Sequence, residues 1–225
     1  EKGFSESEMT DAGLILKNEE GKTHDRFHNR LMFPIRDNRG RTTGFSGRVQ
    51  DDSLPKYMNS PQTAIFDKSG TIYGIDMAGT AIRNKDLVVI VEGYMDVIMA
   101  HQYGFNNVVA SMGTAITEKH INILKKLTKN IALALDPDTA GEEAMLRCVE
   151  YENSLNTEVK VIILPPHEDP DEVIKKDPKI WESAIEKAVP VIDYTIDMAV
   201  SRQDMSTAGA KSQVENSLLP IIAKV

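Results

Sequence analysis

The sequence has little cysteine: Cys148 is the only one among 225 residues. A single cysteine cannot form a disulfide within the chain, and it excludes a cysteine-rich zinc site. No apolar run approaches the roughly 18 residues that a membrane-spanning helix requires. The first residues lack the basic and apolar segments of a signal peptide. Low-complexity tracts are also missing, and 41% of the residues are hydrophobic. We therefore expect a soluble, cytoplasmic protein with a substantial core.

Net positive charge is also lacking, since the formal net charge is −8. That value alone argues against a nucleic-acid partner. The distribution of charge points the other way. Residues 22–68 contain nine Lys or Arg and five acidic residues, whereas the remainder contains seventeen basic and twenty-nine acidic residues. The chain is thus polarised, with a basic segment near the N-terminus beside an acidic part.

Hydrophobic patterning divides the chain into three predicted regions: an N-terminal α+β basic subdomain (1–77), a central metal-binding domain (78–177) and a C-terminal helical subdomain (178–225). In the first region we expect a short helix and turn over 5–21, strands over 30–36 and 42–49 joined by a hairpin turn, and an irregular segment over 53–63. Pro34 indicates an edge strand or a bulge. Gly44 and Gly47 would let a backbone or a ligand approach closely.

Strands and helices alternate in the second region. We expect strands over 87–91, 107–111, 131–135 and 159–164 and helices over 94–103, 117–129 and 139–153. This alternation predicts a mainly parallel sheet covered by helices. Thr117 and His120 occupy the cap and third positions of a helix but lack the Glu or Gln of a capping box. We expect the histidines to lie at the surface. The third region predicts helices that break at Pro178, Pro190 and Pro220, with Trp181 in a small bundle.

The most informative stretch is Leu-Val-Val-Ile-Val-Glu-Gly-Tyr-Met-Asp at 87–96. Five apolar residues, four of them β-branched, predict a strand that is buried on both faces. In an open α/β sheet, the binding crevice lies beyond the carboxyl ends of the strands. Glu92 follows the strand directly, and Asp96 falls in the first turn or so of the next helix. A single carboxylate at such a place is more often simply solvated.

Acidic residues also follow two later strands. Asp136 and Asp138 come after the third predicted strand, and Asp169 and Asp171 come after the fourth. Taken separately, these are good turn and helix-start sequences, because Asp caps helices and Pro suits a first turn. Taken together at one sheet edge, so many carboxylates would repel one another. A divalent ion relieves that repulsion, and Mg²⁺ prefers oxygen ligands. The pattern therefore favours a metal site for phosphate chemistry.

Three acidic motifs thus stand in order: Glu-Gly-Tyr-Met-Asp at 92–96, Asp-x-Asp-x-x-Gly at 136–141 and Glu-Asp-Pro-Asp at 168–171. They resemble the Toprim domain of primases, type IA and type II topoisomerases, and some nucleases and recombination proteins. Further motifs are similar to the RNA polymerase core of the bacterial replicative primase family (DnaG type). These motifs are 25–35, 44–48, 55–63, 66–68 and 110–114.

The resemblance also has gaps. That family begins with a zinc ribbon and ends with a helicase-binding domain, and neither is recognisable here. We therefore expect a fragment that holds the catalytic core alone. Pro137 and Gln62 stand where some relatives have Gly and Glu, and neither supplies a required ligand.

The resemblance implies a DNA-directed RNA polymerase that makes short RNA primers on single-stranded DNA from nucleoside triphosphates. It implies Glu92, Asp136 and Asp138 as catalytic residues. The implied ligands of two or more Mg²⁺ or Mn²⁺ ions, without zinc, are Glu92, Asp96, Asp136, Asp138, Asp169 and Asp171. Whether Glu92 is a ligand or a general base stays open. The implied partners are the template, the RNA–DNA product, and a replicative helicase and single-strand binding protein through domains not found here.

Basic and aromatic side chains would bind the nucleotide or the DNA. A single basic residue is more often a solvated surface charge, but the motif match favours phosphate contacts for several of them. The expected set is Arg26, Arg48, Lys56, Tyr57, Asn59 and Lys68. Tyr57 and Asn59 could stack on or hydrogen-bond a base or sugar.

Two other functions remain open. One is a Toprim nuclease or topoisomerase fragment, although no tyrosine here has the context of a topoisomerase nucleophile. The other is a non-catalytic module that binds nucleotides or single-stranded DNA.

Overall fold

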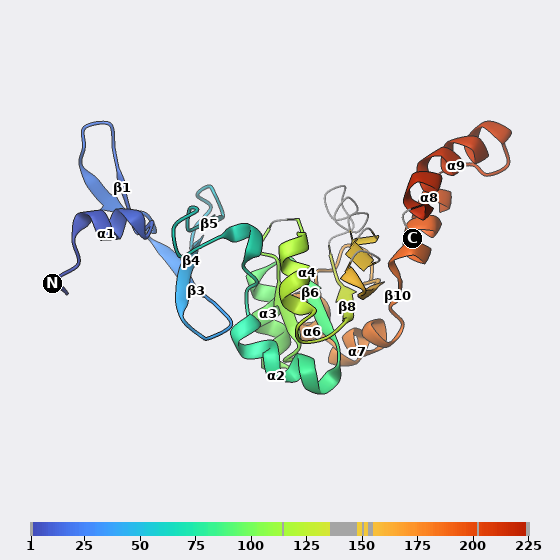
Figure 1. The fold of residues 1–225 in the computed structure, drawn as a ribbon, viewed down its shortest axis with the longest axis horizontal. Helices are drawn as coiled ribbons and strands as arrows, with labels where there is room; N and C mark the ends of the chain where they lie inside the picture. The colour runs from blue at the N-terminus through green and yellow to red at the C-terminus, as the bar shows by residue number, and fades with distance from the viewer. Residues whose placement is uncertain are drawn as a thin grey trace.

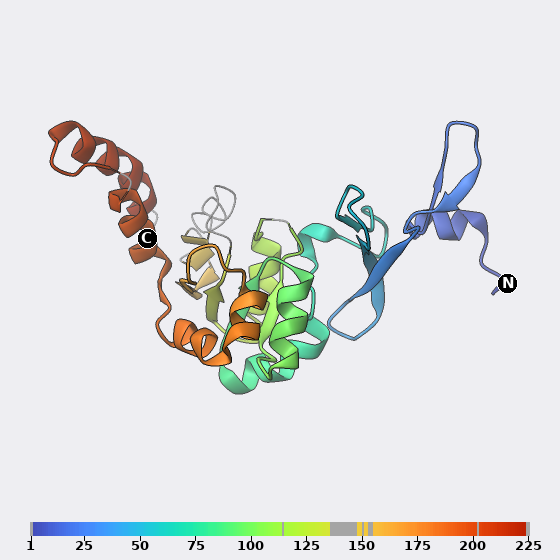
Figure 2. The ribbon, with the colours of Figure 1, turned by 180° about the vertical axis from the view of Figure 1, so that it is seen from behind.

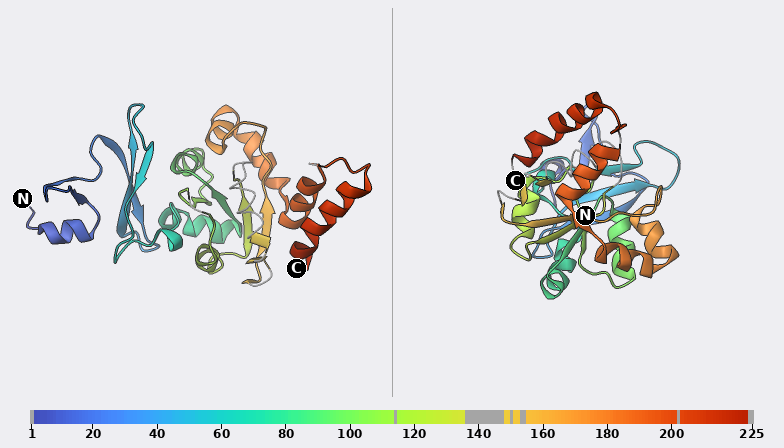
Figure 3. Two further views of the ribbon diagram at one scale, coloured as in Figure 1. Left: turned by 90° about the horizontal axis from the view of Figure 1, so that it is seen from above. Right: turned by 90° about the vertical axis from the view of Figure 1, so that its right-hand side faces the viewer.

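The computed structural model describes residues 2–113, 115–135, 148–149, 151–152, 155–201 and 203–223. The chain is elongated, with its termini at opposite ends and an α/β domain between them (Figure 1, Figure 3). An N-terminal β-rich part lies on one side of this domain, and a helical tail lies on the other. The predicted fold class, a Toprim-like α/β domain flanked by an α+β part and by helices, is confirmed.

The N-terminal part begins with α1 (Glu6–Asp11), which is capped by Ser5. The prediction of only a helix and a turn over 5–21 was wrong, because β1 (Ile15–Lys17) pairs with β2 (Thr23–Asp25) in a small antiparallel sheet. Five of the six residues in that pair are not buried, so it lacks the alternating apolar pattern that reveals a strand.

The second N-terminal sheet has the order β3–β4–β5, formed by β3 (Arg30–Arg36), β4 (Thr42–Val49) and β5 (Tyr57–Asn59). Pro34 lies in an edge strand, and a register shift follows at Ile35/Arg36, so both alternatives for Pro34 hold. β5 was missed because it falls between two prolines. A Cβ at Gly44 would lie 2.8 Å from the ring of Phe66. The close approach predicted there is made by a side chain of the chain itself.

The central sheet has the order β10–β9–β8–β6–β7. Four parallel strands, β6 (Val88–Val91), β7 (Val108–Ala110), β8 (Asn130–Leu133) and β9 (Glu158–Val161), confirm the mainly parallel prediction. The short β10 (Val189–Pro190) adds an antiparallel edge. Alternate residues of β6 enter different cores: Val88 and Ile90 pack on one face, Val89 and Val91 on the other. This is the period of two that a strand imposes.

Helices cover both faces of this sheet. On one face, α2 (Ile75–Lys85) and α4 (Glu118–Leu124) pack against β6 and β8. The other face, which is turned toward the viewer in Figure 2, is covered by α3 (Tyr94–Gln102), α6 (Pro170–Lys176) and α7 (Pro178–Glu186). Most of the helix predicted over 139–153 lies outside the described residues.

Two expectations for the tail were wrong. Trp181 does not join a separate bundle: it is fully buried in the core of the α/β domain, edge-on to Phe105. Pro220 does not break a helix, because it lies inside α9 (Ala208–Ile222), which packs against α8 (Val191–Ser201). Within the described residues, no helix combines the length and apolarity needed to cross a membrane.

Candidate active site

The acidic residues predicted to converge follow three neighbouring strands. β6, β8 and β9 are adjacent in the sheet, and Glu92 comes directly after β6. Asp169 occupies the N-cap position of α6, which follows β9, without a capping hydrogen bond from its side chain. Asp136 and Asp138 follow β8 but lie outside the described residues. The topology therefore brings two of the three acidic motifs, and the strand that leads to the third, to one edge.

Asp96 ties two of these segments together. Its Oδ2 accepts a hydrogen bond from the backbone N–H of Gly93 at 2.9 Å, which caps α3. Its Oδ1 accepts one from the backbone N–H of Asp171 at 3.3 Å, at the start of α6. A side chain at Gly93 would push the Asp96 carboxylate out of this position, because a Cβ there would lie 2.8 Å from Oδ2. Glycine at position 93 thus leaves room for Asp96 to keep both hydrogen bonds.

The charge of Asp96 is unfavourable in this structure. Its side chain is buried, with 8% of its surface exposed. The pKa of Asp96 is raised to about 7, chiefly by burial and to a smaller extent by the carboxylates of Asp171 and Asp169, while hydrogen bonds from the two backbone N–H groups oppose the shift. A buried carboxylate that faces two others, with oxygen donors only, is the donor set that suits a hard divalent cation.

Among the described residues, however, no group of three or more acidic, His or Cys side chains is close enough to hold a metal. The pair that the structure does bring together is Asp96 and Asp171. A complete ligand set therefore requires further groups, and Asp136 and Asp138 remain predictions for that role.

An aromatic cluster joins this edge to the N-terminal sheet, and its centre is Tyr94, a residue that the sequence reasoning did not single out. The Tyr94 ring stacks on Phe33 and Tyr57, with centroids 5.4 and 5.8 Å away, and meets Tyr73 edge-on at 4.7 Å. Its hydroxyl donates to Oδ1 of Asn59 at 2.8 Å. Burial raises the pKa of Tyr94 to about 12, so this hydroxyl keeps its proton.

The cluster also gathers most of the predicted nucleotide- and DNA-binding residues. Arg48 pairs with Tyr57 across β4 and β5, and its guanidinium lies 5.6 Å from the centre of that ring. Nη2 of Arg26 donates to the backbone carbonyl of Asn59 at 3.5 Å. Lys56 is exposed and directly precedes β5. These residues thus share one surface, beside Tyr94.

Lys68 lies apart from that surface. It begins the 3₁₀ turn η1 (Lys68–Gly70), and its half-buried ammonium has a pKa that burial lowers. The structure places this turn against the start of α4, where it also corrects two predictions. His120 is buried rather than at the surface, and its Nδ1 accepts from the N–H of Thr117 at 3.2 Å. It therefore takes the capping role expected of Glu or Gln, which a sequence rule based on carboxylates and amides cannot reveal.

Two family models match the chain. The model of the DNA primase catalytic core, N-terminal domain, matches residues 1–79, and a Toprim-like model matches residues 89–174. Among solved structures, the DnaG primase catalytic domain bound to ssDNA is 37% identical, with a TM-score of 0.86, over 99% of this chain and 74% of that chain. The chain belongs to the DNA primase family.

Other primases are similar to this chain over nearly its whole length. A DNA primase domain from Pseudomonas aeruginosa is 38% identical, with a TM-score of 0.87, over 97% of this chain and 70% of that one. The DNA primase of Clostridium acetobutylicum is 40% identical over 100% of this chain and 37% of its own length. The chain thus spans well under half of that full-length primase. The Toprim match is consistent with the use of divalent metal.

Proposed function

We propose that this chain is a primase catalytic core that synthesises short RNA primers on single-stranded DNA from nucleoside triphosphates, in the cytoplasm at a bacterial replication fork. The observation that supports it best is the aromatic cluster. Tyr94 lies between Glu92 and Asp96 in sequence, and its ring and hydroxyl contact Tyr57 and Asn59. A surface suited to bases and phosphates is thereby fixed next to the acidic edge.

The residues that would hold the metal are Glu92, Asp96, Asp136, Asp138, Asp169 and Asp171. Bound Mg²⁺ or Mn²⁺ would supply charge stabilisation for the triphosphate when a 3′-hydroxyl displaces pyrophosphate. Glu92 is a candidate for two roles, a metal ligand or the general base that accepts the proton of that hydroxyl, and both fit its place at the end of β6.

On the N-terminal side, we propose contacts to template or nucleotide phosphates by Arg26, Arg48, Lys56 and Lys68. The Arg48 guanidinium lies over Tyr57, so a phosphate bound by Arg48 would lie beside this ring. One structural neighbour is a primase catalytic domain bound to ssDNA, and others are primase polymerase domains in complex with double-stranded DNA, which supports a DNA template as the partner.

The test is RNA synthesis from labelled nucleoside triphosphates on a single-stranded template, with Mg²⁺ or Mn²⁺ and with a chelator. We expect metal-dependent short RNA from the parent and none from Glu92→Gln. The matched control is Glu186→Gln, which changes an exposed glutamate at the end of α7 and should keep full activity.

Three outcomes would overturn the proposal or part of it. Metal-dependent degradation of labelled single-stranded DNA, without RNA synthesis, would identify a Toprim nuclease instead. Tight nucleotide binding with no synthesis at any metal concentration would identify a binding module. Full activity of Glu92→Gln would remove the role of the acidic edge.

A further inference from the structure

The turn that carries Lys68 is held by its own residues first. Asp67 caps it: Oδ1 accepts from the N–H of Ser69 at 3.1 Å and from its hydroxyl at 2.7 Å. The Thr71 hydroxyl donates to the backbone carbonyl of Asp67 at 2.6 Å. A 3₁₀ helix of three residues has too few internal hydrogen bonds to be rigid alone. Further contacts must therefore determine where Lys68 points.

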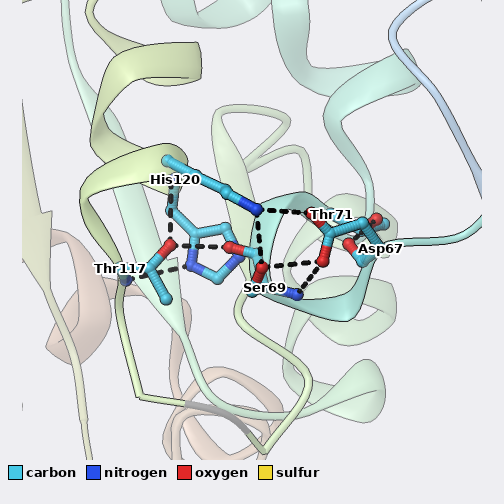
Figure 4. A network of polar contacts seen from close by, with 6 residues as sticks. Asp67, Ser69, Thr71, Thr117 and His120 are labelled. Carbon is cyan, nitrogen blue, oxygen red and sulfur yellow. Dashed lines mark hydrogen bonds and ion pairs between the residues drawn. The ribbon is translucent and has the colours of Figure 1, made fainter. Parts of the chain in front are cut away.

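The start of α4 supplies those contacts (Figure 4). The Thr117 hydroxyl donates to the backbone carbonyl of Ser69 at 2.6 Å. Nζ of Lys119 contacts Oδ2 of Asp67 at 2.7 Å and the Ser69 hydroxyl at 3.1 Å. These residues are about fifty positions away in the sequence, so the contacts are tertiary and fix the turn to the α/β domain.

The His120 ring also packs against the turn. Its side chain is 2% exposed, and because Nδ1 accepts from Thr117, the neutral ring carries its proton on Nε2. Burial lowers the pKa of the imidazole, and the backbone carbonyls of Lys68 and Thr71 face the ring and oppose that shift. Nε2 has no hydrogen-bond partner within the described residues. The imidazole is thus an uncharged, buried group that packs against the turn.

All these contacts reach the residues on either side of Lys68, or its backbone, and none engages its ammonium. Within the described residues, Lys119 forms an ion pair with Asp67, whereas Lys68 forms none. A half-buried ammonium without a carboxylate partner is poorly solvated and suits a phosphate. These contacts therefore do more than stabilise the fold. They orient Lys68 and leave its ammonium available to a ligand.

We propose that Thr117, Lys119 and His120 are positioning residues that fix Lys68 for contact with a phosphate of the nucleoside triphosphate. The inference rests on the proposed function, in which Lys68 binds phosphate. Thr117 is the best residue to substitute, because its hydroxyl makes the shortest hydrogen bond between the start of α4 and the turn.

The first experiment compares Thr117→Val, which removes the hydroxyl at nearly constant shape, with Thr117→Ser, which restores it. Affinity for a fluorescent nucleoside triphosphate is measured with Mg²⁺, beside KM and kcat for RNA synthesis. We expect Thr117→Val to weaken binding about fivefold, the factor of one ordinary hydrogen bond, with kcat changed less than KM. Thr117→Ser should bind as the parent does.

The matched control is Thr207→Val. Oγ1 of Thr117 accepts from the N–H of His120 at 3.2 Å and so caps α4, and Oγ1 of Thr207 likewise accepts from the N–H of Ala210 at 3.2 Å and caps α9. Thr207→Val therefore removes a helix cap away from Lys68. It should lower stability without changing nucleotide affinity. An equal loss of affinity in Thr207→Val would mean that cap loss alone explains the effect, which overturns the proposal.

The second experiment asks whether the effect passes through Lys68. In a double-mutant cycle, Thr117→Val should add nothing to Lys68→Met, since the cation that it positions is already gone. Additive losses would overturn the positioning role. If Lys68→Met binds nucleotide like the parent, the phosphate role assigned to Lys68 fails, and this inference fails with it.

A third measurement does not depend on nucleotide at all. The rate at which an amine-reactive reagent acetylates Lys68, followed by peptide mass spectrometry, reports how the ammonium is held. We expect a changed rate in Thr117→Val and an unchanged rate at Lys126, an exposed lysine just beyond α4. An unchanged Lys68 rate would overturn the positioning role even if primer synthesis were confirmed.

Discussion

Asp96 should make the metal-free protein less stable as the pH rises. Burial raises its pKa from 3.8 to about 7, so the folded protein keeps this proton over a range in which the unfolded chain has lost it. Between those two values the folded state binds more protons, and the free energy of unfolding must fall with rising pH. Above pH 7 both states are ionised and this contribution stops changing.

The size of the effect follows from the shift. About three pKa units correspond to about 4 kcal/mol, at roughly 1.4 kcal/mol per unit. Asp96→Asn removes the titration, but the amide has one carbonyl oxygen where the carboxylate has two. It therefore loses one of the acceptors for Gly93 and Asp171, which costs about 1 kcal/mol. At pH 8 without metal, we expect Asp96→Asn to be more stable than the parent by about 3 kcal/mol.

The assay is urea denaturation from pH 4.5 to 8 with a chelator, repeated with Mg²⁺. The parent should lose stability up to pH 7 and regain part of it with Mg²⁺, because a cation that binds only the folded state stabilises it. Asp96→Asn should show a flatter profile and a smaller response to Mg²⁺. Asp193→Asn, at an exposed aspartate of α8, serves as the control. Parallel pH profiles for the parent and Asp96→Asn would refute the reasoning.

Three further predictions concern side chains that contact the N-terminal part or belong to it. Tyr94→Phe keeps the ring stacking but leaves Oδ1 of Asn59 unpaired, and denaturation should show a loss of about 1–2 kcal/mol; unchanged stability would mean that the hydroxyl is not needed. Lys119→Met should raise the pKa of Asp67, now about 2 because of hydrogen bonds from Lys119 and Ser69. The depressed pKa of Asp67 stabilises the fold above pH 3.8, and this contribution is lost as the pH falls toward 2. Because the side chains of Lys119 and Asp67 are both substantially exposed, Lys119→Met should lower the free energy of unfolding at pH 7 by less than about 1 kcal/mol, as measured by denaturation. Arg48→Ala should weaken single-strand binding and lower its salt dependence by about one phosphate contact, and equal salt slopes in a fluorescence titration would exclude that contact.

The α/β domain could be predicted from the sequence because its signals are local. The buried run Val88–Val91 has no polar interruption, and alternation with helices fixes a parallel arrangement. The acidic motifs were expected to converge, and the sheet order places the three strands before them, β6, β8 and β9, side by side. Asp96 was correctly placed in the first turn of α3, although its contact with Asp171 joins residues 75 positions apart and needed the structure.

What could not be predicted depends on contacts between distant segments. β5 has only three residues and gains its position from β4, not from its own pattern. Tyr94 resembles any buried aromatic residue of a helix until Phe33, Tyr57 and Asn59 are seen around it. His120 looked like a surface histidine because sequence alone does not show that the Lys68 turn lies over it.

These contacts decide how substitutions in the motif at 92–96 should be interpreted. Its residues face different ways: Tyr94 faces the N-terminal sheet, while Asp96 turns to the starts of α3 and α6. Alanine at Asp96 would remove a cap of α3 and a tie to α6 together with any metal ligand, so lost activity would not identify which one mattered. Asparagine removes the charge and one of the two acceptors but keeps the other acceptor. A variant that stays folded, gains stability without metal and loses RNA synthesis would therefore assign the charge of Asp96 to cation binding.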